Sequence, residues 1–283
     1  LTSGERDVIE RMETAFRNCE KLQKHMRLLL DKGGLYKIYN GNLLFHGCIP
    51  LNEDGSLKEI QIYGKKYKGR ELYDVLETYV RRAFFAVDSM EQRKGMDILW
   101  FIWASPSSPL FGKDKMTTFE RYFIADKETH KETKGAYYHL LENEEVVDTL
   151  LQEFDLSPEN GHIINGHVPV HQGEGESPVK CNGKVIVIDG GFCKAYQKVT
   201  GIAGYTLIYN SYGLILSAHE PFTSKEDAVS KESDIVSNRV SVHYTSKRRL
   251  VGDTDTGKAL RERIEELMQL LDAYRKGYIK EKK

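Results

Sequence analysis

Two histidines in this sequence each follow a short apolar run and lie beside a glycine. His46-Gly47 comes after the apolar residues 43–45, and Gly166-His167 comes after the apolar residues 163–164. A neutral imidazole at the end of a buried strand is aimed in a fixed direction and partly shielded from water, which suits a transition-metal ligand. The glycine beside each histidine lets the backbone approach an ion closely. The pattern predicts that His46 and His167 meet at a metal site of a metal-dependent hydrolase.

Each histidine taken alone has a simpler explanation. A histidine that packs in the core, or one that holds a turn through a backbone hydrogen bond, is commoner than a metal ligand. Two motifs of the same kind at strand-to-loop junctions of one chain favour the metal site. By contrast, we interpret His162 and His219 as structural and His171 as a surface residue.

A basic loop is the second candidate for chemistry. Lys113, Lys115 and Arg121 follow or lie close to Gly112, near the start of a predicted short helix over 115–125. Cationic side chains beside a glycine and a helix start suit a phosphate group. An ordinary solvated surface explains the same pattern equally well. These three residues are therefore our predicted substrate-binding residues, with both interpretations open.

Composition restricts the kinds of partner. The 283 residues include 41 Lys and Arg against 42 Asp and Glu, so nothing in the charge balance indicates nucleic acid or a membrane surface. The apolar runs are too short to span a membrane, and no signal-peptide pattern is visible. The four cysteines are sparse and lack CxxC spacing, which predicts reduced thiols and a cytoplasmic protein.

Periodicity predicts the elements that position these residues. We expect helices over 4–30, 71–94, 146–154 and from Gly257 onward, a hairpin over 35–46 with an Asn40-Gly41 turn, and strands at 162–165, 184–188, 204–210 and 214–218. The stretch 222–255 is polar, with no predicted strand. The expected fold class is α+β in three segments. Residues 1–51 form a helix and a strand that lead to the first histidine motif, 52–155 form a mostly helical insertion, and 156–283 form a β-rich part with a C-terminal helix.

The same residues resemble a known family. The histidine motifs are similar to those of the calcineurin-like metallophosphoesterases, and the stretches 108–123, 165–196 and 204–222 resemble the class III (Firmicutes-type) fructose-1,6-bisphosphatases. The stretch 116–122 is the part that narrows the choice to this class. The resemblance covers most of the chain. It implies part of a metallophosphoesterase β-sandwich flanked by helices, with an inserted helical region.

The resemblance also implies a reaction and a cofactor. The complete enzyme would use two divalent metal ions, with Mn²⁺ expected, to hydrolyse fructose 1,6-bisphosphate, a sugar phosphate, to fructose 6-phosphate in gluconeogenesis. His46 and His167 would both ligate the second ion, each with its other ring nitrogen held by a carbonyl or carboxylate. The basic residues Lys113, Lys115 and Arg121 would contact the substrate phosphates.

Part of the family pattern is absent from this chain. The Asp-x-His, Gly-Asp-x-x-Asp-Arg and Gly-Asn-His motifs that precede the His-Gly motif in the superfamily do not occur, and the first residue is Leu1. We therefore expect a carboxyl-terminal portion of a longer enzyme, with its catalytic residues upstream of Leu1. On this expectation the portion alone binds metal weakly and is inactive.

Two other functions stay open. A protein-phosphatase-like or dinucleotide-polyphosphate hydrolase would keep both histidine motifs but leave the stretch 108–122 unexplained. A non-catalytic binding or scaffold module would keep the histidines for packing. If half of a sandwich is missing, an apolar face and unpaired strand edges are exposed, and a homo-oligomer is one way to cover them.

Overall fold

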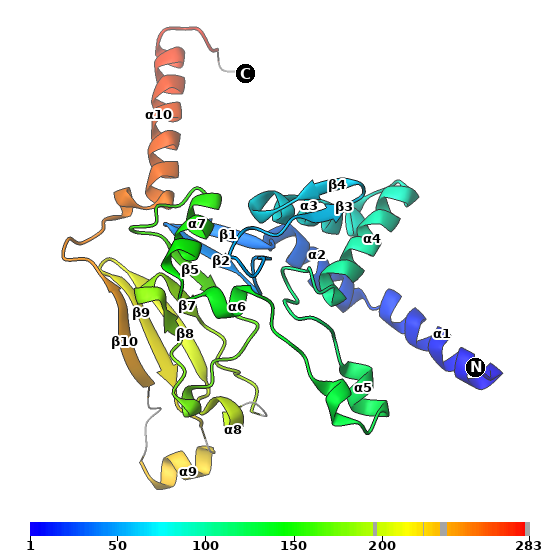
Figure 1. Ribbon diagram of the computed structural model, residues 1–283. Helices are drawn as coiled ribbons and strands as arrows, with labels where there is room; N and C mark the ends of the chain where they lie inside the picture. The colour runs from blue at the N-terminus through cyan, green and yellow to red at the C-terminus, as the bar shows by residue number, and fades with distance from the viewer. Residues whose placement is uncertain (195–196, 223, 233–236, 281–283) are drawn as a thin grey trace.

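A five-stranded sheet forms the centre of the computed structural model, which describes residues 1–194, 197–222, 224–232 and 237–280 (Figure 1). Its strand order is β1-β2-β5-β7-β6. The strands are β1 (Tyr36–Tyr39), β2 (Asn42–Phe45), β5 (His162–Asn165), β7 (Val185–Val187) and β6 (Val179–Lys180). The three middle strands β2, β5 and β7 are parallel, whereas β1 and β6 pair antiparallel at the two edges. The carboxyl ends of β2 and β5 therefore lie side by side.

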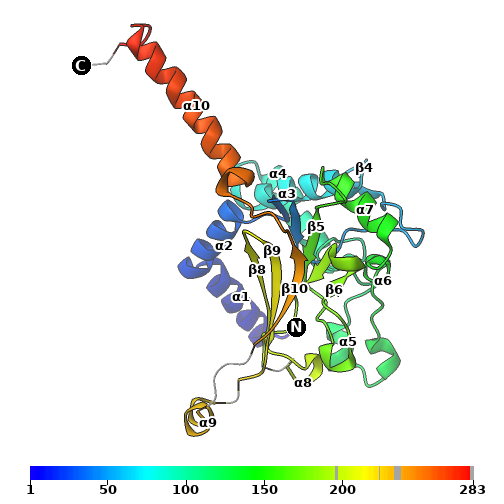
Figure 2. The same cartoon turned by 90° about the vertical axis from the view of Figure 1, so that its left-hand side faces the viewer.

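A second sheet packs against the first. It contains β8 (Gly204–Asn210), β9 (Gly213–His219) and β10 (Ser237–Tyr244), all antiparallel in the order β10-β9-β8. Figure 2 shows it beside the central sheet. Buried side chains of both sheets, such as Ile163 and Leu216, belong to one hydrophobic core. The predicted α+β fold class is confirmed.

A separate small core joins a hairpin to two helices. Strands β3 (Ile60–Ile62) and β4 (Lys65–Tyr67) pack on α3 (Gly69–Phe85) and α4 (Ser89–Ala104). The single helix predicted over 71–94 was wrong, because the backbone is extended at Ala86 and the Asp88 side chain caps a new helix by accepting from the Glu91 N–H. Helical periodicity alone does not reveal such a break.

The end of the predicted helical insertion joins the main core. Helices α6 (Tyr137–Leu140) and α7 (Glu144–Glu153) bury Tyr137, Leu150 and Leu151 against the central sheet. The chain between Gly112 and Gly135 forms an arm that carries α5 (Thr118–Phe123) and the 3-10 helix η1 (Lys127–His130). The division of the chain into segments 1–51, 52–155 and 156–283 stays a prediction.

The two ends of the described chain are helical. At the N-terminus, one helix was predicted over 4–30, but the structure has α1 (Ser3–Arg17) and α2 (Glu20–Lys32), separated at Asn18-Cys19. Neither helix has a buried residue. At the other end, α10 (Asp255–Arg275) follows the 3-10 helix η4 (Val251–Asp253).

The remaining elements are short. They are α8 (Gln197–Thr200), α9 (Lys225–Ser230), η2 (Gln172–Glu174) and η3 (Cys181–Gly183). Strand β10 was not predicted, because most of its side chains are exposed at the edge of the second sheet and give no alternating pattern. Residues 195–196 of the family-like stretch and 281–283 of the third predicted segment lie outside the described residues. Among the described helices, none has both the length and the apolar character needed to cross a membrane.

Candidate metal centre

The structure brings the two predicted metal ligands together. The Nε2 atom of His46 lies 3.0 Å from the Nδ1 atom of His167. The ring centroids are 4.9 Å apart and the ring planes meet at 68°. Two nitrogen atoms from distant parts of the chain thus face one another at the carboxyl ends of β2 and β5.

Strand pairing explains why the two motifs meet. Parallel pairing aligns Leu43 with Ile163 and Leu44 with Ile164, so both strands end at the same level. Beyond the strands, the Gly166 N–H donates to the His46 carbonyl at 2.9 Å. This backbone hydrogen bond therefore joins the histidine of the first motif to the glycine of the second.

Asn165 makes a further connection that the sequence analysis missed. Its side-chain Nδ2 donates to the Gly47 carbonyl at 3.1 Å, and the residue is only 1% exposed. The Oδ1 atom of the same amide has no hydrogen-bond partner within the described chain. The available signal was a polar residue at the end of an otherwise apolar buried strand, immediately before Gly166-His167.

The surroundings of His167 fix its tautomer. Its Nε2 atom lies 2.8 Å from the Phe111 carbonyl, and because a carbonyl only accepts, this nitrogen carries the proton. The Nδ1 atom consequently keeps a lone pair directed at His46. The expected carbonyl partner of a metal-binding histidine is thus present for His167, whereas no such contact is seen for the second ring nitrogen of His46 in the described residues.

Electrostatics keep His167 neutral at neutral pH. Burial lowers the pKa of the imidazole, and the neighbouring His46 and Lys113 lower it further. The Phe111 carbonyl and Asp189 act in the opposite direction but do not outweigh these effects. Only the neutral ring has a lone pair to offer a metal ion.

A close backbone contact holds the first motif against a neighbouring loop. A Cβ atom at Gly47 would lie 2.4 Å from the Pro109 carbonyl, whereas one at Gly166 would lie 3.6 Å from its nearest neighbour. The Cys48 N–H also donates to Pro109 at 2.8 Å. Because Gly47 has no side chain, the loop that contains Pro109 can approach its backbone closely. The same loop supplies the Phe111 carbonyl that contacts His167. Burial raises the pKa of the Cys48 thiol to about 12, so Cys48 is a core residue rather than a nucleophile.

The three predicted substrate-binding residues all have partners inside the arm. Lys113 Nζ lies 2.8 Å from Glu132, and Lys115 Nζ donates to the Thr129 carbonyl at 3.3 Å. Arg121 donates through Nε to Thr117 at 2.9 Å. Of the three, only Lys113 has a charge that affects the pKa of His167.

A single acidic side chain organises this arm. Burial by itself would raise the pKa of Glu132, but hydrogen bonds from Lys113 and from the backbone and side chain of Thr117 hold it at about 2. The charge of Lys113 is therefore largely balanced by Glu132.

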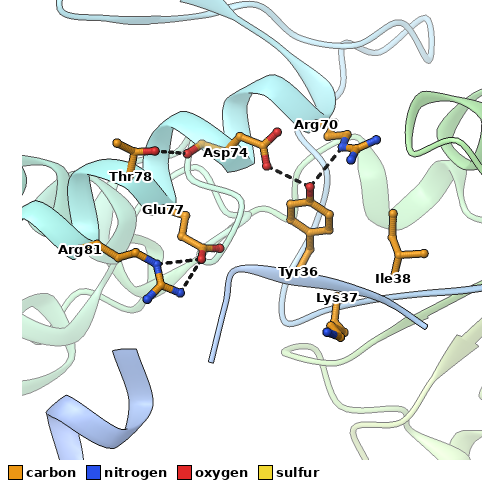
Figure 3. Close-up of a pocket in the computed structure, with 8 residues that line it drawn as sticks. All are labelled: Tyr36, Lys37, Ile38, Arg70, Asp74, Glu77, Thr78 and Arg81. Carbon is orange, nitrogen blue, oxygen red and sulfur yellow. Dashed lines mark hydrogen bonds and ion pairs between the residues drawn. The ribbon is translucent and has the colours of Figure 1, made fainter. Parts of the chain in front are cut away.

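A pocket in the described part of the chain lies elsewhere. It has a volume of about 520 Å³ and is lined by residues of β1 and α3, including Tyr36, Arg70 and Arg81 (Figure 3). Arg81 forms an ion pair with Glu77 at 2.7 Å, and Arg70 donates to the Tyr36 hydroxyl at 3.2 Å. Because neither histidine lines the pocket and both of its arginines are already paired, we assign the candidate site to the histidine pair.

The pair provides only part of a coordination sphere. Over the described residues, no group of three or more His, Cys, Asp or Glu side chains is arranged to hold a metal ion. Protein metal sites of this kind usually have three or four protein ligands. Fold and site together define an α+β protein with a two-histidine candidate metal centre.

Comparison with known sequences identifies the family. Residues 1–276 match the family described as Firmicute fructose-1,6-bisphosphatase, and the chain belongs to this family. It is 57% identical over 282 residues to a fructose-1,6-bisphosphatase class 3 of Clostridioides difficile (strain 630), covering 99% of this chain and 43% of that protein. It is 54% identical over 282 residues to the protein of the same name from Clostridium tetani (strain Massachusetts / E88), again covering 99% of this chain and 43% of the relative. The chain thus spans less than half the length of these relatives. No solved structure matches it.

Proposed function

We propose that this chain is the part of a fructose-1,6-bisphosphatase that supplies two histidine ligands to a divalent metal ion. The complete protein would hydrolyse fructose 1,6-bisphosphate to fructose 6-phosphate, a step of gluconeogenesis. One observation carries the proposal: His46 Nε2 and His167 Nδ1 face each other at 3.0 Å. Family membership supports the substrate.

The donor atoms fit a six-coordinate divalent ion. In an octahedral site with metal–ligand distances of about 2.1 Å, neighbouring ligand atoms lie about 3.0 Å apart. That value agrees with the separation of the two ring nitrogens. Imidazole ligands suit transition metals, which is compatible with the expected Mn²⁺. A bound divalent ion would polarise a phosphoryl oxygen and lower the pKa of water from 15.7 to about 7.

The residues of this chain would hold and move protons around that ion. Phe111 keeps the proton of His167 on Nε2, so its Nδ1 needs no rearrangement to bind metal. His46 Nε2 must be the donor in the present contact, because Nδ1 of His167 accepts. To become a ligand, His46 would shift its proton from Nε2 to Nδ1.

The remaining ligands would come from outside this chain, in a dinuclear centre of the complete protein. Among the three basic residues, we favour Lys113 as a phosphate contact because its charge reaches the histidine pair. Each of the three would have to exchange its present partners to bind phosphate: Lys113 its ion pair with Glu132, and Lys115 and Arg121 their backbone and Thr117 hydrogen bonds. We also propose a cytoplasmic location, supported by four cysteines that are all free thiols.

Phosphate release by the complete protein tests the proposal. With Mn²⁺, we expect fructose 1,6-bisphosphate to be hydrolysed in preference to a phosphoprotein or a dinucleotide polyphosphate. No release from the sugar bisphosphate would overturn the substrate, and preference for another substrate would support one of the alternative hydrolases.

Calorimetry tests the metal site separately. The 283-residue chain should bind Mn²⁺ weakly, and the variant His46→Ala should abolish that binding. The matched control His171→Ala changes a histidine that we interpret as a surface residue. Unchanged Mn²⁺ binding by His46→Ala would place the metal elsewhere.

A further inference from the structure

Helix α10 extends away from the body of the protein. Figures 1 and 2 both show it projecting alone beyond the central sheet. Only Gly257, in its first turn, is buried. In proteins most of the stability of a helix comes from the packing of an amphipathic face, so this 21-residue helix is expected to gain stability from a packing partner.

The start of α10 is firmly attached. Asn40 N–H donates to the Asp255 side chain at 2.7 Å, and Asp255 N–H donates back to the Asn40 side chain at 2.9 Å. The hydroxyls of Tyr39 and Thr256 share a hydrogen bond of 2.8 Å. These contacts with the β1–β2 turn set the direction in which the helix leaves the body.

The exposed apolar residues of α10 follow a heptad pattern. They recur alternately four and three residues apart, at Leu260, Ile264, Leu267, Leu271 and Tyr274. Each of these side chains is between 43% and 55% exposed. Alternate spacing of four and three places the residues on one seam of the helix from Leu260 to Tyr274, as at the a and d positions of a coiled coil.

We propose that α10 forms a parallel two-stranded coiled coil with α10 of a second copy of this chain. In heptad terms, Ile264 and Leu271 occupy a positions, while Leu260, Leu267 and Tyr274 occupy d positions. At Ile264 a β-branched a residue stands between leucines at the neighbouring d positions, a combination that favours two parallel strands. The acidic side chains Glu262 and Glu265 lie on the opposite, solvent-facing side of the helix.

The flanking charges favour the parallel arrangement. In a parallel pair, Arg263 lies beside Met268 of the second copy and Arg275 lies beside its Leu270, so no two arginines meet. Consider instead an antiparallel pair in which Ile264 of one copy lies opposite Tyr274 of the other. Arg261 then lies on the same side of the interface as Arg275 of the second copy, which places like charges close together. Arg263 is also neutralised within its own helix by Glu266 at 2.6 Å.

The apolar area is sufficient for association. Met268 and Leu270 flank the seam and are exposed as well, so the face contains seven large apolar side chains. Packing two such faces together buries on the order of 1,000 Å², near the lower limit for a specific interface. An interface of this size is expected to depend on individual seam residues.

Light scattering and sedimentation of the 283-residue chain and of the complete protein test this inference. Both should be dimers, and Leu267→Glu should convert them to monomers. Gln269→Glu adds the same charge on the outer face and should leave the dimer intact, while circular dichroism checks that each variant keeps its helix content. Wild-type monomers, or dimers that survive Leu267→Glu, would mean that α10 is free or covered by another part of the polypeptide, and would overturn the proposal.

Cysteine crosslinking tests the direction without relying on a disruptive variant. In a background of Cys19→Ser and Cys193→Ser, which removes the exposed thiols, Leu260→Cys should oxidise to a disulfide-linked dimer. Only the parallel arrangement brings residue 260 of one copy to residue 260 of the other. The control Glu262→Cys, on the outer face, should crosslink poorly. Equal crosslinking at both positions, or none at 260, would overturn the parallel coiled coil.

Discussion

Two histidine pairs in this protein have nearly the same ring geometry and different surroundings. The His46–His167 rings are 4.9 Å apart at 68°, and the His162–His243 rings are 5.0 Å apart at 72°. In the first pair two nitrogen atoms face each other at 3.0 Å, beyond the ends of parallel strands. The second pair lies between the two sheets, with His162 only 7% exposed.

The comparison shows that proximity of two imidazoles does not by itself make a metal site. Burial lowers the pKa of His162 to about 4, with smaller contributions from His243 and Arg249, and burial also lowers the pKa of His167. His162 and His167 are therefore both neutral at pH 7. What distinguishes the pairs is the access of the ring nitrogens, since His243 Nε2 is buried without a hydrogen-bond partner in the described residues.

The largest expected difference between the pairs is in catalysis by the complete protein. His46→Ala or His167→Asn removes a proposed metal ligand and should lower kcat at least 100-fold, or about 2.7 kcal/mol in activation free energy. His162→Asn should leave kcat within about threefold at pH 7.5, because that ring would not touch metal or substrate. Phosphate release from fructose 1,6-bisphosphate is the measurement. An equal loss of kcat in the variants of both pairs would mean that the His46–His167 pair has no special role in catalysis.

The close contact of Gly47 with the Pro109 carbonyl, beside the first histidine pair, should affect the free energy of unfolding. Gly47→Ala places a methyl group against the Pro109 carbonyl and should lower the free energy of unfolding by about 2 kcal/mol. Gly166→Ala is the matched control, because its methyl group would meet only ordinary contacts, and we expect a change within about 0.5 kcal/mol. Urea unfolding of both variants decides the matter. A greater loss from Gly166→Ala would contradict the close contact between Gly47 and the loop that contains Pro109.

The second pair should make stability depend on pH. His162 has a pKa of about 4 in the folded protein against 6.5 for an unperturbed histidine, so between these values the unfolded chain binds the additional proton. Stability should therefore fall as pH decreases from 6.5 toward 4, by up to about 1.4 kcal/mol per pH unit. Urea unfolding at several pH values measures the slope, and His162→Gln should reduce it. An unchanged slope in that variant would assign the pH dependence to other groups.

An effect no larger than that of Gly47→Ala is expected at Asn165, which connects the two motifs of the first pair. Asn165→Ala leaves the buried Gly47 carbonyl without its side-chain donor and should cost about 1–2 kcal/mol. It should also change the ¹⁵N chemical shifts of the His46 and His167 rings. Asn42→Ala, which removes another buried asparagine at the far end of β2, is the control and should leave those shifts unchanged. Equal shifts in both variants would indicate a general loss of packing.

Local patterns accounted for the features of the fold that depend on neighbouring residues. The Asn40-Gly41 turn predicted the first hairpin, and the strand predicted over 204–210 matched β8 in both bounds. The two helix breaks, at Asn18 and Ala86, were missed because the apolar periodicity continues on both sides of each break. Strand β10 was missed because an exposed edge strand carries little hydrophobic signal.

The site was predictable only in part, for a similar reason. The glycine and the apolar strand beside each histidine were enough to predict that His46 and His167 lie close together. The Phe111 carbonyl and the Pro109 contact come from a loop whose position depends on tertiary packing, so no local sequence pattern predicts them. The partners of Lys113 and Arg121 likewise come from the other side of the arm, at Glu132 and His130.

The backbone of His167 has a consequence for how this family can change over evolutionary time. Its φ angle of 71° lies in the left-handed region, where most residues incur a steric cost and glycine, asparagine and aspartate incur little. A lineage released from selection for the imidazole would accordingly drift at this position toward those three residues. His46 has no such backbone restriction. Substitution patterns at the two positions should therefore differ in descendants that no longer use the proposed metal ligands, with a narrow set of residues at 167 and a broad set at 46.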